Sequence, residues 1–244
     1  VAAAQSAQQS ATIVAPALGG LLYAFGSVWV YGPTVILYII ACALMLNLPA
    51  RQTPLNKGKA TLDSLLAGIR FIRSRPDILG AISLDLFAVL LGGATALLPV
   101  FAKDILLTGP WGLGLLRSAP AVGALLMSLF LARFAVERNV GRVMFTAVGV
   151  FGVATIVFGL SRAFPLSVAA FMIAGMADQV SVVMRQTAIQ LATPDALRGR
   201  VSAVNMIAIA ASNQLGAVES GFVAAATSAT FAVVSGGVGC LVVV

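Results

Sequence analysis

The sequence contains no histidine and few charged residues. Its 244 residues include 8 acidic and 15 basic side chains, so charged residues make up 9% of the chain. An average soluble domain carries about 25%. A chain this poor in charge cannot cover a globular surface with polar groups, which excludes a soluble enzyme, a DNA-binding domain and a disordered tail. The lack of histidine also excludes histidine-dependent serine catalysis and histidine-ligated metal sites.

Other absences narrow the function further. The two cysteines, Cys42 and Cys240, lie inside separate apolar runs, so they indicate neither a disulfide framework nor a metal site. The sequence has no Gly-x-x-x-x-Gly-Lys phosphate loop and no Gly-x-Gly-Asp motif of intramembrane aspartyl enzymes. We therefore expect no enzyme activity, no cofactor and no bound metal.

Apolar residues make up 60% of the chain, and they gather in runs close to the about 20 residues that cross a bilayer. A turn is expected at Gly26-Ser27, because the first 50 residues are too long for one crossing. The predicted segments cover residues 5–25, 29–48, 78–101, 112–132, 143–161, 166–184, 201–225 and 230–244. Frequent Gly, Ala and Ser suit close helix packing, and strand-like alternation is absent. The sequence predicts an all-α polytopic membrane protein with about eight membrane helices.

Basic residues lie between the apolar runs and mostly on one side. Six, three and three of them fall in residues 49–77, 133–142 and 185–200, which accounts for 12 of the 15. Lys103 and Arg162 lie on the opposite side. By the positive-inside rule, the three basic stretches are expected in the cytoplasm. Because these charges flank membrane runs, we expect no nucleic-acid partner despite the net charge of +7.

The longest polar region contains a helical pattern. Within residues 61–73 the apolar side chains fall on one stripe and arginines cluster at the C-terminal end. The stripe consists of Leu62, Leu65, Leu66, Ile69 and Ile72. Two related interpretations remain open, namely a basic amphipathic helix on the inner leaflet and a solvated linker helix. Pro76 is expected to end this helix before the next crossing.

A proline followed by two glycines interrupts the first apolar run. Pro16 is expected to kink the helix, while Gly19 and Gly20 allow a neighbouring backbone to approach closely. The stretch Ala15-Pro16-Ala17-Leu18-Gly19-Gly20 is similar to the Pro-x-x-Gly-Gly end of an antiporter motif of twelve-helix transporters. A packing kink without a role in transport is the alternative.

Two connecting stretches add to this similarity. Residues 136–142 resemble an Asp-Arg-x-Gly-Arg signature, with glutamate in place of aspartate. Residues 185–201 resemble the connection between helices 10 and 11 of bacterial exporters, and Thr193 is expected to cap the helix that starts at Pro194. Together these motifs resemble the major facilitator superfamily, in the branch that is related to enterobactin exporters and often called transmembrane secretion effectors.

The resemblance implies helices 5 to 12 of a twelve-helix protein. Residues 1–48 would form the last two helices of the N-terminal half, residues 49–77 a cytoplasmic linker, and residues 78–244 the six-helix C-terminal half with a truncated last helix. The missing N-terminal helices of the same protein would be its partner, together with the lipid bilayer. The implied function is proton-coupled efflux of small amphiphilic molecules, siderophore or drug-like, by alternating access across the bacterial plasma (inner) membrane. A channel or a non-transporting scaffold is the alternative.

Charged and polar residues inside the spans are candidates for transport. The ionisable ones are Asp85, Asp178, Arg117 and Glu219, since charge is costly in lipid. We expect Asp85 to be the coupling acid, because its neighbours offer no counter-charge and such burial favours a protonated carboxyl group. Glu219 is expected to pair with Arg117. Salt bridges that only set helix packing are the alternative for each residue.

Two further groups of residues follow from the same reasoning. Asn205, Asn213 and Gln214 can line a cavity, or they can join helices through hydrogen bonds. An acid and arginines at helix ends can pair in one state and separate in the other, or they can simply anchor the chain. The gating candidates are Glu137, Arg138, Gly141, Arg142, Arg198 and Arg200.

Overall fold

The computed structural model describes residues 15–16, 18–20, 22–23, 25–46, 62–92, 94–134 and 139–244. These residues form helices and no strand, which confirms the predicted all-α class. Six of the described helices are long and apolar enough to cross a membrane, and a shorter apolar helix follows them. The predicted turn is present, since Gly26 has a φ angle of 121° and α2 (Val28–Leu46) begins directly after it. Most of the predicted 5–25 segment lies outside the described residues.

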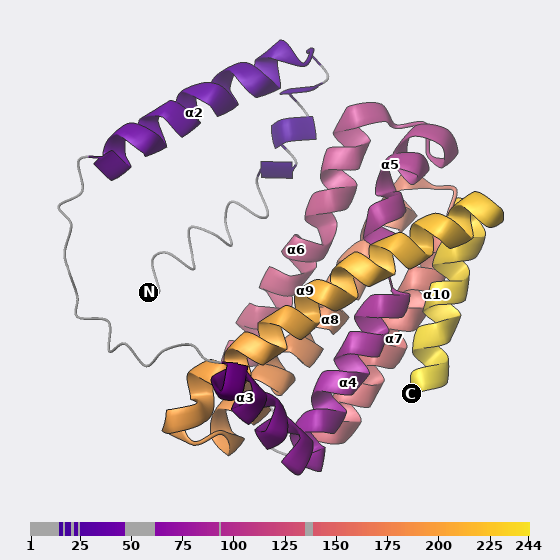
Figure 1. Ribbon diagram of the computed structural model, residues 1–244. Helices are drawn as coiled ribbons and strands as arrows, with labels where there is room; N and C mark the ends of the chain where they lie inside the picture. The colour runs from indigo at the N-terminus through magenta and orange to yellow at the C-terminus, as the bar shows by residue number, and fades with distance from the viewer. Residues whose placement is uncertain are drawn as a thin grey trace.

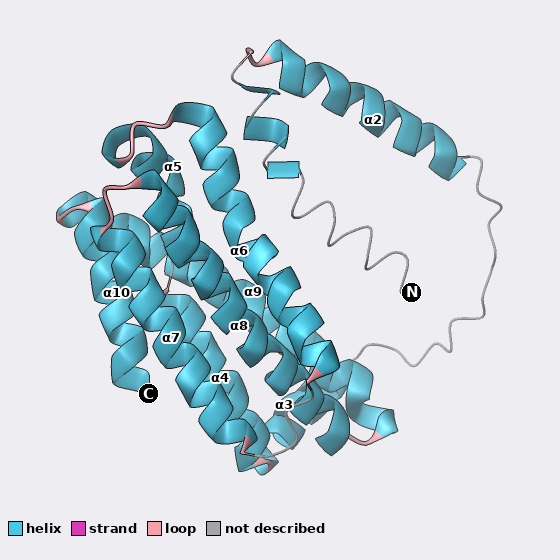
Figure 2. Ribbon diagram, turned by 180° about the vertical axis from the view of Figure 1, so that it is seen from behind, coloured by secondary structure: helices cyan, strands magenta, loops and turns pink. Residues whose placement is uncertain are grey.

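The later helices form one bundle. In order they are α3 (Leu62–Ser74), α4 (Pro76–Leu91), η1 (Ala94–Leu97), α5 (Leu98–Val100), η2 (Phe101–Ile105), α6 (Gly109–Arg133), α7 (Val140–Leu160), α8 (Phe164–Ala192), α9 (Asp195–Ala226) and α10 (Ala229–Val243). Helix α8 packs against α6 and α7, and α10 packs against α7 (Figures 1 and 2). Helix α2 lies apart from the bundle and buries none of its residues (Figure 1).

The end of the bundle that carries α3, at the bottom of Figure 1, is called the α3 end below. The start of α4 and the connection between α8 and α9 also lie there. Helix α8 continues to Ala192, about two turns beyond the predicted apolar run at residues 166–184. Placing Arg185 in a loop was therefore wrong, because the helix continues through it.

Helix α3 packs against α9 rather than standing free. A Cβ atom at Gly68 would lie 3.1 Å from the carbonyl oxygen of Arg200, so the two backbones touch. Ile72 is buried in a cluster with Ile78 and Val201. Of the predicted apolar stripe, Leu66 and Ile69 remain exposed. The helix therefore turns the face with Gly68 and Ile72 to the bundle.

The segment after α4 is a broken helix. Helix α4 ends at Leu91, and the chain continues through a 3₁₀ turn, a short α-turn and a π-turn before α6. Glycines of two other helices fit against the last carbonyl groups of α4, since a Cβ at Gly216 would lie 2.6 Å from the oxygen of Leu90. A Cβ at Gly236 would collide with the oxygen of Leu91. The break is thus enclosed by α9 and α10.

Two glycines bring α6 and α8 into backbone contact. A Cβ atom at Gly175 of α8 would collide with the backbone of Pro120, and one at Gly123 of α6 would collide with the carbonyl group of Met172. Small residues at such crossings let membrane helices gain contact area, since no hydrophobic effect drives helices together in lipid. The α6–α8 crossing is therefore fixed by two glycines on opposite partners.

We expect Gly175→Ala to destabilise the bundle by about 1–3 kcal/mol, the usual cost of overpacking. The added methyl group must displace the backbone of Pro120 rather than a flexible side chain. The matched control is Gly149→Ala on α7, where no atom lies within 4 Å of the new Cβ. The midpoint of thermal unfolding in detergent should fall for Gly175→Ala only. An equal midpoint for the two variants would contradict the close crossing.

Candidate functional site

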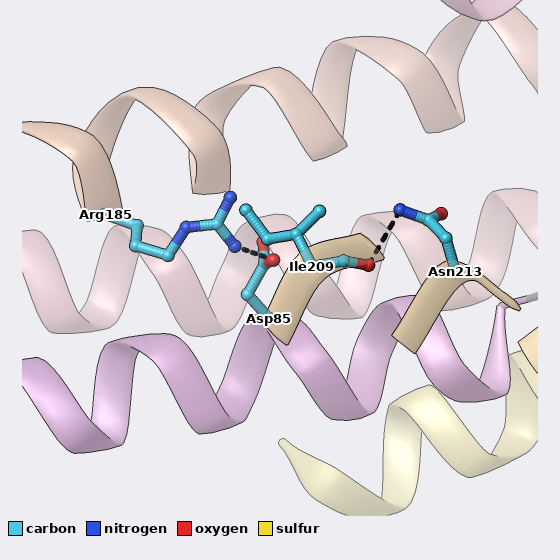
Figure 3. A network of polar contacts seen from close by, with 4 residues as sticks. All are labelled: Asp85, Arg185, Ile209 and Asn213. Carbon is cyan, nitrogen blue, oxygen red and sulfur yellow. Dashed lines mark hydrogen bonds and ion pairs between the residues drawn. The ribbon is translucent and has the colours of Figure 1, made fainter. Parts of the chain in front are cut away.

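The centre of the site is a buried ion pair. Arg185 Nη1 of α8 contacts Asp85 Oδ2 of α4 (Figure 3), and the two side chains are 2% and 3% exposed. The expectation that Asp85 lacks a counter-charge was therefore wrong. Its partner was missed because Arg185 was assigned to a cytoplasmic loop, whereas it lies two turns inside α8.

Helical spacing places both members of the pair. Ile78, Ile82 and Asp85 follow one another at intervals of four and three residues on the buried face of α4. Ser181 and Arg185 are likewise four residues apart on the buried face of α8, and Ile189 continues that face. Because residues three and four apart share a helix face, each charge is carried into the bundle by the apolar residues around it.

Asp178 of α8 lies in the same region and has no ionic partner among the described residues. It lines a narrow void together with Asp85 and Ser181. It also lines a cavity of about 150 Å³ that reaches the break after α4. Among the described residues, no ion pair or hydrogen bond involves its carboxyl group. Asp178 thus combines a carboxyl group, adjacent space and no fixed counter-charge.

Two polar residues that line this cavity each donate a hydrogen bond within their own helix. Thr155 Oγ1 donates to the carbonyl oxygen of Phe151 at 2.8 Å. Asn213 Nδ2 donates to the carbonyl oxygen of Ile209 at 3.1 Å (Figure 3). Both residues line the cavity with Asp178. The hydroxyl oxygen of Thr155 and the amide oxygen of Asn213 remain as acceptors, so they can hold water or a protonated carboxyl group.

The predicted pair between Arg117 and Glu219 is wrong. Glu219 is exposed on α9, and its Oε2 accepts a hydrogen bond from Ser220 Oγ at 3.4 Å. Arg117 forms no ion pair with any described residue. It faces a different element, the segment at residues 15–23. The pairing was predicted because both residues lie far from the basic loops along the chain. Position along the chain does not determine which helix face carries a side chain.

Arg117 lines a large cleft between described residues. The cleft has a volume of about 630 Å³ and lies between the 15–23 segment, the π-turn η2 and the start of α6. Pro16, Gly19 and Gly20 line its other wall. A Cβ at Gly20 would lie 2.8 Å from the Cα of Gly114, so the backbone of Gly20 lies against the backbone of α6. The residues of the antiporter-like motif therefore border a cleft.

The remaining candidates are dispersed. Asn205 is buried, and its Oδ1 has no partner among the described residues. Gln214 is exposed, as are Gly141, Arg142 and Arg200. Arg198 pairs with exposed Asp195 at 2.8 Å, and Glu137 and Arg138 lie outside the described residues. Thr193 does not cap α9, since Pro194 holds the cap position without a side-chain bond. The described residues contain no cluster of His, Cys, Asp and Glu that can hold a metal.

One residue of the site was not recognised from the sequence. Arg185 was counted among the loop cations, although the spacing of Asp178, Ser181 and Arg185 places three polar residues on one face of a long helix. Seven residues correspond to about two helical turns, so this spacing was the available signal. It can be read only if the helix is known to continue past residue 184.

The chain is similar in sequence to a known protein family and to known proteins. Residues 1–217 match the profile of the Major Facilitator Superfamily. The chain is 30% identical over 193 residues to the enterobactin exporter EntS of Escherichia coli O1:K1, a match that covers 78% of the chain and 46% of the relative. The EntS protein of Shigella boydii serotype 18 matches with the same identity and coverage. The chain spans about half the length of the curated relatives it matches.

Proposed function

The chain belongs to the major facilitator superfamily, and from this premise we propose that it is part of a secondary active exporter of small amphiphilic molecules. The relatives that support an export role are named as enterobactin exporters. The six apolar helices of a multi-pass membrane protein agree with such a role. We further propose that the protein resides in the bacterial inner membrane with the α3 end in the cytoplasm, because most basic residues flank that end.

The proposed energy source is the proton gradient, and the proposed proton-binding group is Asp178. The observation that supports this choice is a carboxyl group without a partner beside an occupied ion pair. Protonating Asp85 would leave the buried charge of Arg185 uncompensated, which costs several kcal/mol. Protonating Asp178 leaves no such charge behind. Asp178 therefore replaces Asp85 as the coupling acid.

The cavity next to Asp178 gives the proton a route. Its volume of about 150 Å³ exceeds the about 30 Å³ that one water molecule occupies in the liquid. Oxygen acceptors of Thr155 and Asn213 can hold such water close to the carboxyl group. In a single-site antiporter, alternating access exposes one site to each side of the membrane in turn. We infer that Asp178 takes up a proton from one side and releases it to the other.

Transport by the full-length protein in liposomes tests this function. With an imposed pH gradient, we expect a fluorescent amphiphile to accumulate above its equilibrium level, because proton flow drives the uphill step. A protonophore should abolish the accumulation within the same experiment. Empty liposomes provide the control for passive partitioning of the amphiphile. Equilibration without accumulation would indicate a channel, and no protein-dependent flux would indicate a scaffold.

A further inference from the structure

We propose that the cleft between the 15–23 segment and α6 binds an anionic group of the exported molecule, so that the substrate class is amphiphilic anions. This inference rests on the proposed export function and specifies its substrate. It is carried by the charges and the shape of the cleft. Neither feature was used to assign the coupling acid.

Two cations line the cleft without a carboxylate to balance them. Lys103 of η2 and Arg117 of α6 both belong to its wall, and no acidic residue does. Neither cation forms an ion pair within the described part of the chain. The neighbouring Asp104 is exposed and is not part of the wall. Both side chains are exposed, so two positive charges without an ion pair among the described residues face one open cleft.

The facing segment cannot neutralise them. The first acidic residue of the sequence is Asp63, so residues 1–62 contain no carboxylate at all. Arg117 lies eight residues into α6, about 12 Å from its start. An arginine at such depth is costly unless a cavity or a counter-ion accompanies it. The cleft supplies the cavity, and an anionic ligand would supply the counter-ion.

The rest of the wall suits the apolar part of an amphiphile. Pro16, Tyr23 and Leu113 line it, and its volume of about 630 Å³ falls within the range of sites for drug-sized ligands. Gly19 leaves open space, since no atom lies within 4 Å of its Cβ position. A side chain at that position would project into this space. The missing side chain at Gly19 thus leaves the cleft wider at that position.

The chemistry of the two cations defines the anionic group. The planar guanidinium of Arg117 can donate two parallel hydrogen bonds to a carboxylate, sulfonate or phosphate, and the ammonium of Lys103 adds a point charge. Such an anion must be attached to an apolar or aromatic body of moderate size. An anionic phospholipid has the same chemistry, so the experiment must separate it from a transported molecule.

A pair of dyes tests the charge preference. 1-Anilinonaphthalene-8-sulfonate and N-phenyl-1-naphthylamine share an aromatic body, and only the first carries an anionic group. We expect the full-length protein in nanodiscs of zwitterionic lipid to bind the sulfonate more tightly. Arg117→Gln should weaken sulfonate binding about tenfold or more, the worth of one hydrogen bond to a charged group, and leave the neutral dye unchanged. Fluorescence titration measures both affinities.

Controls separate charge from folding. Arg162→Gln removes an exposed cation that bonds Thr230 at the same end of the bundle, and it should change neither affinity. Arg117→Lys keeps the charge and should recover part of the sulfonate affinity, while Lys103→Gln tests the second cation independently. Equal loss for both dyes in Arg117→Gln and Lys103→Gln, or no loss for either, would overturn the anion site.

Further measurements distinguish a bound phospholipid from a transported molecule. Displacement of the sulfonate by anionic phospholipid, with no transport of the sulfonate, would assign the cleft to lipid and overturn the substrate class. Uphill transport of the sulfonate that Arg117→Gln reduces would support it. Binding is measured without a gradient, so it does not depend on coupling. Charge-selective binding with no uphill transport of either dye would refute the export function and leave the binding site intact.

Discussion

We expect most of the Arg185→Met protein to fail to fold. The substitution leaves Asp85 buried without its counter-charge, and breaking a buried ion pair from one side costs about 3–5 kcal/mol. The bundle cannot lower this free-energy cost by exposing the carboxylate to water. The Asp85 side chain is 3% exposed and is buried at the contact of α4 with α8. The monodisperse fraction after solubilisation and the midpoint of thermal unfolding measure the loss.

A second substitution should reverse this effect. In Asp85→Leu/Arg185→Met both charges are absent, so neither is left unpaired, and apolar pairs can replace a buried ion pair at little or no cost. We expect the double variant to regain most of the lost stability. Arg198→Met is the matched control, since it removes an exposed pair with Asp195 that is worth at most about 1 kcal/mol. A double variant as unstable as the single one would contradict the pairing.

Asp178→Asn is expected to abolish uphill efflux driven by a pH gradient, because the amide can no longer take up and release a proton. Exchange of substrate at equal concentrations on both sides needs no proton transfer, so counterflow should survive. The amide is close in size to the carboxyl group, and the residue forms no ion pair with the described residues that the change can break. Liposome transport with and without the gradient measures both activities.

Glu219→Gln is the control for this second prediction. Glu219 is also an acid within an apolar helix, but it is exposed and bonds only its neighbour Ser220 in the described part of the chain. We expect uphill transport and counterflow to remain at the level of the unmodified protein. Full uphill transport by Asp178→Asn at every pH would assign Asp178 to packing and remove it from the coupling step.

The helices could be predicted from the sequence more readily than the contacts between them. Apolar length alone indicated the crossings, because the bilayer sets the number of residues that a helix needs. The end of α8 was misplaced, since a buried arginine resembles the basic residues that follow a membrane helix. Pairing of Asp85 with Arg185, which are about 100 residues apart in the chain, depends on the rotation of two helices. No local pattern in the sequence fixes that rotation.

The cleft could also be predicted only in part from the sequence. Pro16, Gly19 and Gly20 were recognised as a kinked, small-residue segment, and Arg117 was recognised as an unusual charge in a span. Their proximity depends on the close approach of Gly20 to Gly114. A pattern of small residues indicates that a helix can pack closely, but it does not identify the partner. The residue types were therefore predictable and their juxtaposition was not.

The glycine crossing of α6 and α8 also connects the cleft with the region around Asp178. Pro120 and Gly175 meet at this crossing. Arg117 lies three residues before Pro120, and Asp178 lies three residues after Gly175, so each is about one helical turn from the same contact. Closely packed backbones are hard to compress. We therefore expect α8 to tilt together with α6. A displacement of α6 at the cleft should then reach Asp178 through this backbone contact.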